Sequence, residues 1–537
     1  MTNKGRQHII LAIAIAATFI PLLLIEARVL SFTKGMFIYP VDDTFIHMEL
    51  AKNLAQNGNW GINSHEFSSA SSSILYTLLL ALLFKIFSVS TLFPMIINAI
   101  AGLGLLVAIN RWLGRQQLSF TAQLLIILGV IFITPLPVLV MSGMEHTLQC
   151  LFSFLFLFGV SDWIALNRRQ GELKWHLPWS IPVLALLVTA IRYEGLFMVA
   201  TACLVLLMYK KIGAAFRIGL FGLMPVVIFG LYAISKGSYF LPNSVLIKSE
   251  EVSLFSGGIG HFFEAVLVEK LTLARAGITA MATQRLLLML PATAVIFYRF
   301  LRPQLSYLLI LAILTFCTFL HLTLASTGKF YRYEAYLVLC SAVVTATVFA
   351  KYTAAVFSAK PGMRHVLGLI LLFFLALPLL LRVSAAYTKA GRACINIYEQ
   401  QYQMGRFLQK FYPDEGVAAN DIGAVAYFTN GRVVDLWGLG DFDIAKSRRK
   451  KYWTPSFLDT ISRRKNARLA IVYDSWFNDS LGRHWQKLAT WKIPYNVVCG
   501  DDIVSFYAID SSIAPRLKKD LEMYQPLLPG EVEVKYY

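Results

Sequence analysis

The stretch SSILYTLLLALLFKIF, residues 72–87, decides how the rest of the chain is arranged across a membrane. It is apolar, but it is shorter than the roughly 17–25 residues of a typical spanning helix, and it contains Lys85. If it crossed the membrane, five later basic segments would lie outside, against the positive-inside rule. These segments are residues 111–115, 168–174, 210–217, 299–302 and 351–364. We therefore expect residues 72–87 to form an interfacial helix on the outer surface.

Eleven other apolar segments accompany this stretch, and we interpret each as a membrane span. They lie near residues 8–28, 92–110, 120–140, 147–165, 177–191, 195–209, 217–234, 285–300, 304–323, 334–350 and 364–383. The 537 residues are 57% hydrophobic and 15% charged, whereas about a quarter of a soluble chain is charged. We expect a polytopic α-helical membrane protein with about 11 transmembrane helices plus the interfacial helix in the first outer loop. Its basic N-terminus is expected in the cytoplasm, before an uncleaved first span.

The net charge of +18 is distributed unevenly. Residues 391–537 contain 20 Lys and Arg and 17 Asp and Glu, so they carry +3 and the first 390 residues carry +15. Because this excess lies in loops between apolar segments, it follows the positive-inside rule and does not indicate a nucleic-acid surface. We expect a transmembrane domain over residues 1–389 and an extracytoplasmic, periplasmic domain over residues 390–537.

The second domain has the alternating helix and strand patterns of a small α/β domain. An amphipathic helix is predicted over 396–411, and strands are predicted over 416–421, 431–438, 468–476, 495–499 and 502–510. Asp421, Asp435 and Asp441 lie near turns after strands, either as structural turn residues or as contacts for an acceptor glycan. Cys394 and Cys499 flank the domain, and they either pair or remain two free thiols.

The first outer loop contains two consecutive carboxylates, Asp42 and Asp43, before a helical pattern that includes His47. An aspartate at a helix start accepts backbone N–H bonds and meets the positive end of the helix dipole. One aspartate suffices for that capping role. We therefore expect one of the pair to act as a general base, with its pKa tuned by the other.

Four other outer loops carry side chains suited to phosphate or hydroxyl chemistry. Arginine and lysine suit a phosphate group, and carboxylates suit the deprotonation of a hydroxyl. The residues are Glu145 and His146, Arg192 and Glu194, Asn243 and Lys248, and Arg332 and Glu334. The alternatives are a helix-start acid at Glu145, a structural ion pair between Arg192 and Glu194, and a solvated loop around Arg332.

Several blocks of this sequence resemble the GT-C class of integral-membrane glycosyltransferases, which use polyprenyl-phosphate sugars and carry an acidic motif in the first outer loop. DDTFIHMELAKNLAQNGNWGIN, residues 42–63, is similar to a motif of a branch related to mycobacterial arabinofuranosyltransferase B. SGMEHTL, RYEGL, LPNSVLIKSE and the segment 420–441 resemble later blocks of that family. The chain departs from the family pattern at Tyr193, where proline is usual, and at Met48–Glu49, where many relatives carry arginine.

This resemblance implies a site on the outer side of a bacterial inner (plasma) membrane. Asp42 or Asp43 would be the base for the acceptor hydroxyl, and Glu145 and Glu194 would line the same cavity. Donor phosphate would be held by Arg192, Lys248 and Arg332, and substrate would be contacted by His47, His146, Asn243 and Glu334. The implied donor is a polyprenyl-phosphate sugar, with arabinofuranose as one candidate, and the acceptor is an envelope glycan, lipid or protein. No cofactor is certain, and a divalent cation, Mg or Mn, between carboxylate and phosphate is left open.

Three other functions were weighed against glycosyl transfer. An oligosaccharide or O-antigen-type ligase would move a whole glycan from a pyrophosphate carrier. A secondary transporter would need ionisable groups near mid-span and paired repeats, which the sequence does not display. A non-catalytic subunit of an envelope complex would tolerate replacement of Asp42 or Asp43 by asparagine, whereas the enzyme would not.

Overall fold

The computed structural model describes residues 3–170, 175–249, 278–358, 362–477 and 481–537, and it divides into two compact units. Unit 1 comprises Met1–Leu24, Met95–Ile228 and Glu251–Thr388. Unit 2 comprises Ile25–Pro94, Phe229–Glu250 and Lys389–Tyr537. Boundaries between the units fall inside the helices α1, α4, α10 and α17.

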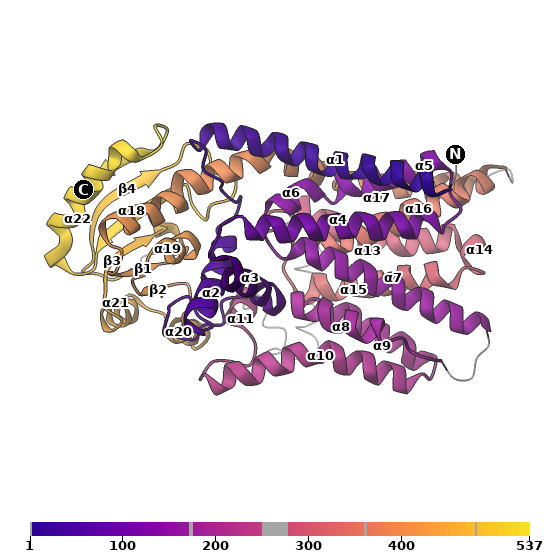
Figure 1. The fold of residues 1–537 in the computed structure, drawn as a ribbon, viewed down its shortest axis with the longest axis horizontal. Coiled ribbons are helices and arrows are strands. Elements are labelled where there is room, and N and C mark those ends of the chain that lie inside the picture. The colour runs from indigo at the N-terminus through magenta and orange to yellow at the C-terminus, as the bar shows by residue number, and fades with distance from the viewer. Residues whose placement is uncertain (1–2, 171–174, 250–277, 359–361, 478–480) are drawn as a thin grey trace. The chain divides into compact units, whose positions relative to one another are not determined.

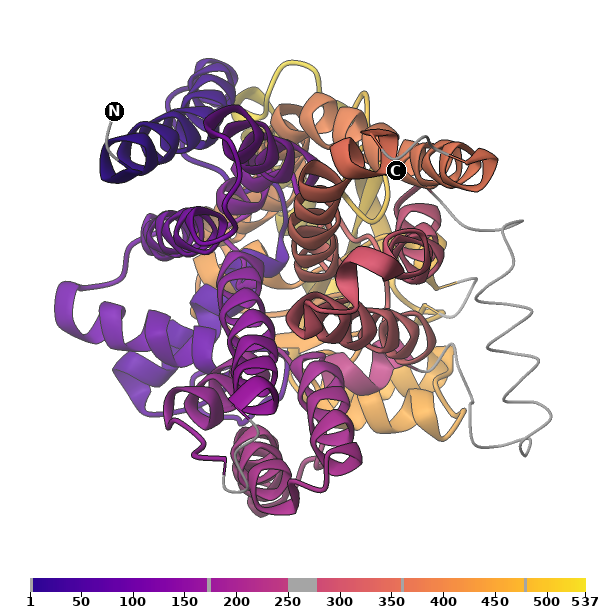
Figure 2. The same cartoon turned by 90° about the vertical axis from the view of Figure 1, so that its right-hand side faces the viewer.

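Unit 1 is built from helices, several of which run side by side in Figure 1 and are seen end-on in Figure 2. The α7 helix packs against α8, α15 and α16, and α13 packs against α15 and α16. The helices are α1 Asn3–Phe32, α4 Phe93–Gly114, α5 Phe120–Ile133, α6 Leu136–Met141, α7 His146–Gln170, α8 Ser180–Ile191, α9 Gly195–Met208, α10 Ile212–Ser235, α13 Ile278–Ile296, α14 Tyr298–Leu301, α15 Leu305–Leu324, α16 Ala335–Ser358 and α17 Met363–Ile397.

Every apolar segment identified in the sequence contains a helix. Among the described residues, seven helices are long and apolar enough to cross a membrane, and five further apolar helices of 10–17 residues are shorter. The short set includes α3, Ile74–Phe87, which covers the stretch that decides the topology. A polytopic helical membrane protein is therefore confirmed. The exact number of crossings and the interfacial position of α3 stay predictions.

Unit 2 contains a six-stranded mixed sheet of order β2-β1-β3-β5-β4-β6. The β1 strand pairs in parallel with β2 and β3, and the remaining pairs are antiparallel. The strands are β1 Gly416–Ala419, β2 Val433–Asp435, β3 Ala467–Val472, β4 Gln486–Lys492, β5 Ile503–Ala508 and β6 Glu533–Tyr536. The helical elements are α2 Asp43–Asn57, α3, α11 Asn243–Ser249, the π-helical turn η2 Tyr398–Tyr402, α18 Gln403–Phe411, α19 Gly423–Phe428, α20 Phe442–Arg449, α21 Pro455–Arg464 and α22 Ala514–Tyr524, with short 3₁₀ turns at Asp474–Trp476, Ser511–Ile513 and Gln525–Leu527.

Helices cover both faces of this sheet. Alternate residues of a strand point to opposite faces, so a strand such as β3 contributes side chains to a core on each side. Leu469 and Ile471 of β3 belong to a core shared with α18 and α22. Ala470 and Val472 belong to a second core shared with α20 and α21. The expected C-terminal α/β domain is therefore confirmed as a three-layer arrangement.

The first core also contains Ile46 and Leu50 of α2, together with Val425 of α19. Residues 25–94 and 229–250 thus belong to the same compact unit as the C-terminal sheet, although the sequence-based division placed them in the membrane domain. The α2 helix packs against both α3 and α19.

The expected secondary structure of residues 390–537 is correct in part. The predicted strands over 416–421, 431–438, 468–476 and 502–510 overlap β1, β2, β3 and β5. The strand predicted over 495–499 is wrong, because the side chain of Asn496 accepts the backbone N–H groups of Val498 and Cys499 and closes a turn. Cys394 and Cys499 are free thiols in the structure.

Candidate functional site

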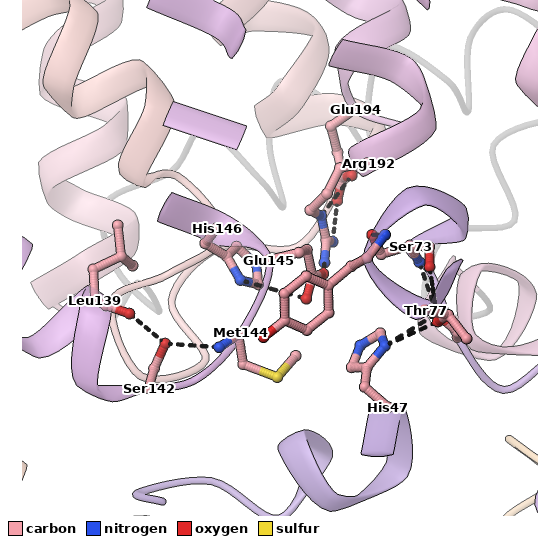
Figure 3. Close-up of polar contacts among 12 residues, drawn as sticks. His47, Ser73, Thr77, Leu139, Ser142, Met144, Glu145, His146, Arg192 and Glu194 are labelled. Atoms are coloured by element: carbon pink, nitrogen blue, oxygen red, sulfur yellow. Dashed lines mark hydrogen bonds and ion pairs between the residues drawn. The ribbon is translucent and has the colours of Figure 1, made fainter. Parts of the chain in front are cut away.

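A buried ion cluster centres on Arg192 of unit 1 (Figure 3). Its Nη1 donates to Glu145 Oε1 at 2.6 Å. Its Nη2 and Nε donate to Glu194 Oε1 and Oε2 at 2.5 and 3.0 Å, a bidentate geometry that lysine cannot reproduce. The structure thus brings together three predicted site residues. It also bears out the structural ion pair that was the alternative interpretation of Arg192 and Glu194.

Two tight turns place these three side chains. Arg192 is extended immediately after α8, and Glu194 precedes α9, so both project from one short connection. Gly195 is required there, because a Cβ atom would lie 2.2 Å from the carbonyl oxygen of Val188. Glu145 precedes α7 at the end of a second turn, in which Ser142 Oγ donates to the carbonyl oxygen of Leu139.

The charges of the cluster stabilise one another in a poorly solvated environment. Burial alone would raise the pKa of Glu194, but the Arg192 guanidinium lowers it to about 2. Burial alone would lower the pKa of Arg192, but Glu194 and Glu145 raise it well above its usual range. A carboxylate with so low a pKa is a weak base. Glu194 is therefore suited to electrostatic and orienting roles rather than to proton abstraction.

An aromatic ring joins further predicted residues to this cluster. The guanidinium groups of Arg192 and Arg332 lie 5.0 and 5.4 Å from the ring centre of Tyr333, within cation–π range. The His146 ring stacks on Tyr333, with ring centres 5.6 Å apart. His146 Nδ1 lies 4.0 Å from Glu145 Oε2. Tyr333 thus gathers two arginines and a histidine, and one of these arginines, Arg192, already has Glu145 and Glu194 as counter-charges.

Glu334 has a different environment from its neighbour Arg332. It is fully buried and accepts from Arg382 Nε at 2.9 Å and from the backbone N–H of Gly328 at 2.8 Å. Arg382 also donates to the carbonyl oxygen of Tyr331 at 2.6 Å. These bonds hold a turn in which Gly328 and the next three residues all have positive φ, a conformation that costs non-glycine residues free energy. Glu334 therefore shapes the loop that carries Arg332.

Asp42 of unit 2 caps a helix, but not the helix that follows it in the sequence. Its side chain makes no capping bond to α2. Its two carboxylate oxygens instead accept from the backbone N–H groups of Gly423 at 2.6 Å and Ala424 at 2.8 Å, at the start of α19. Asp42 thus caps a helix N-terminus, as an aspartate at that position can, but the helix that it caps is α19 and not α2.

A second carboxylate lies beside Asp42. Burial together with the charge of Asp421 raises the pKa of Asp42. Asp421 follows β1, and its Oδ2 accepts from Gln401 Nε2 at 2.8 Å and from the Tyr473 hydroxyl at 3.1 Å. Asp435 and Asp441, by contrast, bind backbone amides of their own turns, as turn aspartates do.

The other predicted residues of unit 2 are distributed as follows. Asp43 is half-buried and opens α2. His47 Nδ1 lies 3.2 Å from Ser71 Oγ and 3.4 Å from Thr77 Oγ1. Asn243 begins α11 and is buried, and its Oδ1 has no hydrogen-bond partner among the described residues. Lys248 belongs to α11, but its side chain lies outside the described residues.

A divalent cation does not fit the donor sets that the structure describes. Within residues 3–170, 175–249, 278–358, 362–477 and 481–537, no group of three or more His, Cys, Asp or Glu side chains could hold a metal ion. The carboxylates of Glu145 and Glu194 bind Arg192, and those of Asp42 bind backbone amides. The proposed reaction is therefore derived without a divalent cation, which the sequence had left open.

Sequence reasoning missed three residues of these networks. Arg382 gave the clearest signal, because it is an arginine inside an apolar segment, and such residues are paired inside the protein. Tyr333 gave no signal of its own between two charged neighbours. Gln401 lies in the π-helical turn η2, a local irregularity that the amphipathic pattern of residues 396–411 does not reveal.

Comparison with known proteins gives a family match and likenesses to solved structures. The family described as "Domain of unknown function (DUF8728)" matches residues 395–507. No curated protein matches the sequence. The crystal structure of ArnT from Cupriavidus metallidurans in the apo state is similar over 95% of this chain and 99% of that chain, with a TM-score of 0.51 and 12% identity. This likeness establishes the GT-C-like fold that was expected, and it establishes no activity. The arabinofuranosyltransferase B-like branch stays a prediction.

Proposed function

We propose that this chain is a membrane glycosyltransferase that moves a sugar from a polyprenyl-phosphate donor to an envelope glycan, lipid or protein on the outer side of the inner membrane. The observation that carries the proposal is the buried Glu145–Arg192–Glu194 cluster beside Tyr333 and Arg332, set in a fold shared with ArnT along almost the whole chain. Buried ionisable groups of a membrane protein are costly, and they are retained where function needs them.

The reaction requires one bond to form and one to break. The acceptor hydroxyl oxygen attacks the anomeric carbon of the donor, and the bond from that carbon to the phosphate oxygen breaks. Polyprenyl phosphate leaves with the electron pair, and the hydroxyl proton passes to a carboxylate of the first outer loop, Asp42 or Asp43. Such a base contributes about 10²–10⁴ in rate.

The leaving phosphate needs positive charge that is already in position. In this proposal Arg332 and Lys248 contact the phosphate. Arg192 has two carboxylate partners, so a phosphate would have to displace one of them. We therefore assign Arg192 to holding Glu145 and Glu194 in place, with these two carboxylates oriented toward sugar hydroxyls. His47, His146 and Asn243 are assigned to substrate contacts.

The sugar and the carrier are the finer parts of the proposal. Arabinofuranose is proposed as the donor sugar on the resemblance of residues 42–63 to the arabinofuranosyltransferase B branch. A ligase that moves a whole oligosaccharide from a pyrophosphate carrier is the alternative within glycan chemistry. A carrier with one phosphate and a carrier with two differ in product, because only the second leaves a diphosphate.

Mass analysis of envelope glycans and glycoproteins from a strain that lacks this chain tests the proposal. We expect one glycan or glycolipid to lose a single sugar residue, and the wild-type chain to restore it. The Glu194→Gln variant should restore less than about a hundredth of the wild-type level. Glutamine is uncharged, so Arg192 loses one of its two counter-charges. Loss of a whole oligosaccharide block would favour the ligase, and an unchanged glycan profile would contradict both.

A further inference from the structure

We infer that Asp42 is a positioning residue that fastens the first outer loop to α19, and that the base of the reaction is Asp43. The inference rests on the proposed glycosyl transfer and assigns different tasks to two adjacent aspartates that the sequence alone leaves equivalent.

The first observation is the occupancy of both carboxylate oxygens of Asp42. Oδ2 accepts from Gly423 and Oδ1 accepts from Ala424, at 2.6 and 2.8 Å. The side chain is buried, with 7% of its residue surface exposed. A base must offer an oxygen to the hydroxyl proton of the acceptor at hydrogen-bond distance. Each oxygen of Asp42 already accepts one amide bond, so an acceptor hydroxyl would have to reach a remaining lone pair of a buried side chain.

The second observation is that the backbone at the start of α19 lies very close to Asp42. A Cβ atom on Gly423 would lie 2.2 Å from the carbonyl oxygen of Asp42 and 2.4 Å from its Oδ2. Only glycine permits the start of α19 to approach Asp42 in this way. The contact is thus built from both partners, which lie 381 positions apart in the sequence.

The third observation is that α2 also holds the other end of α19. Lys52 Nζ donates to the carbonyl oxygen of Tyr427 at 3.1 Å, and the Phe45 ring packs against the rings of Tyr427 and Phe428. A carboxylate therefore meets the first amides of α19 and an ammonium meets its last carbonyls, which matches the polarity of the helix. Asp42 is one end of a two-point clamp.

The fourth observation concerns the second carboxylate beside Asp42, that of Asp421. Burial and the neighbouring carboxylate raise the pKa of Asp42, so the pair retains a proton more readily than a free aspartate does. Burial raises the pKa of Asp421 as well, although the hydrogen bonds from Gln401 and Tyr473 lower it. Asp43, the half-buried first residue of α2, is the carboxylate of the pair to which the proton transfer is assigned.

Two measurements on the full-length chain in lipid nanodiscs test the division of labour. Backbone amide exchange reports the anchoring of α19, and transfer from a panel of polyprenyl-phosphate sugars, followed against pH, reports the base. Asp42→Asn and Gly423→Ala should speed exchange over residues 423–428, and Asp42→Asn should lower kcat/KM less than about tenfold, with the acid limb of the pH profile retained. Asp43→Asn should leave that exchange unchanged, lower kcat/KM at least about a hundredfold and abolish the acid limb.

Asp441→Asn is the matched control, because Asp441 caps α20 through the N–H groups of Asp443 and Ile444 at 3.0 and 3.3 Å. It should speed exchange over residues 442–449 and not over 423–428. The inference is overturned if Asp42→Asn is as inactive as Asp43→Asn with unchanged exchange of α19, because Asp42 would then be the base. If the wild-type chain transfers no sugar, the proposed function fails, whereas the exchange data still decide whether Asp42 anchors α19.

Discussion

At the scale of single residues, the Arg192 guanidinium is the best-defined charge in the structure. It has carboxylate partners on two turns that are 47 positions apart in the sequence. A buried ion pair of this kind adds little stability relative to apolar residues of the same shape, but removal of one partner leaves a buried charge without compensation. The cluster therefore links local stability to the orientation of Glu145 and Glu194.

Replacement of Arg192 tests this link. Arg192→Gln should lower the free energy of unfolding by about 3–5 kcal/mol, because Glu145 and Glu194 lose their counter-charge. Arg192→Lys keeps the charge but loses the bidentate geometry, so its loss should be smaller while transfer activity still falls. Thermal unfolding in detergent and kcat/KM measure the two effects. Arg299 is exposed, so Arg299→Gln is the control. Equal unfolding temperatures for Arg192→Gln and Arg299→Gln would contradict a stabilising role of the Arg192 ion pairs.

Glu49 of α2 gives a pH-dependent prediction. Burial raises its pKa to about 7, against the opposing effect of Lys52, whose Nζ lies 2.5 Å away. Because the folded-state pKa is raised, the stability that Glu49 contributes is fully present below its usual pKa of 4.5 and is lost as the pH rises through about 7. The melting temperature should fall across this window, and Glu49→Gln should flatten the fall. An equally steep curve for the variant would show that other groups cause it.

At the scale of elements, the connection between α8 and α9 determines whether Arg192 and Glu194 can meet. Gly195→Ala would force a Cβ atom against the carbonyl oxygen of Val188 at 2.2 Å, so the turn must open. We expect at least about a tenfold loss of activity together with a lower melting temperature. Gly213→Ala is the matched control, since a Cβ at Gly213 meets nothing within 4 Å. Similar behaviour of the two variants would contradict the steric argument.

The same scale shows what sequence patterns can and cannot predict. Apolar segments were correctly placed because a run of apolar residues is a local property. The β4 and β6 strands were missed, because Gln486–Lys492 and Glu533–Tyr536 mix polar and apolar residues. Residues 495–499 have the composition of a strand, but they form a turn, because the Asn496 side chain binds the backbone N–H groups of Val498 and Cys499.

At the scale of the whole molecule, the sequence indicated which charged residues belong to the networks. It did not indicate which residues they bind. Arg192, Glu194 and Glu145 were selected as loop charges, and the structure joins them. The bonds of Asp42 to α19 and of Glu334 to Arg382 join residues far apart in the chain, and no periodicity encodes such pairs. Local sequence propensity predicts helices and strands, whereas contacts between residues far apart in the chain depend on how these elements pack.

The membrane arrangement yields a prediction about the two ends of α3. If Ile74–Phe87 lies at the interface, the segments before and after it are on the same, outer side. Single cysteines that replace His65 and Ser90, in a chain without the six native cysteines, should both react with an impermeant maleimide added to intact cells. A cysteine that replaces Gln170 should react only after permeabilisation. Labelling of position 65 without position 90 would show that the helix crosses the membrane and would reverse the later loops.

The most direct measurement of the central claim is the turnover of a defined donor by the purified chain. The chain in nanodiscs would be supplied with polyprenyl-phosphate sugars, pentoses included, and with a membrane extract as the source of acceptor. Mass spectrometry would follow the free polyprenyl phosphate and the glycosylated acceptor. We expect equal molar amounts of free polyprenyl phosphate and glycosylated acceptor from one donor, and a loss of turnover of at least about a hundredfold in Asp43→Asn. Failure of the wild-type chain to consume any donor in the panel, or undiminished turnover by Asp43→Asn, would contradict it.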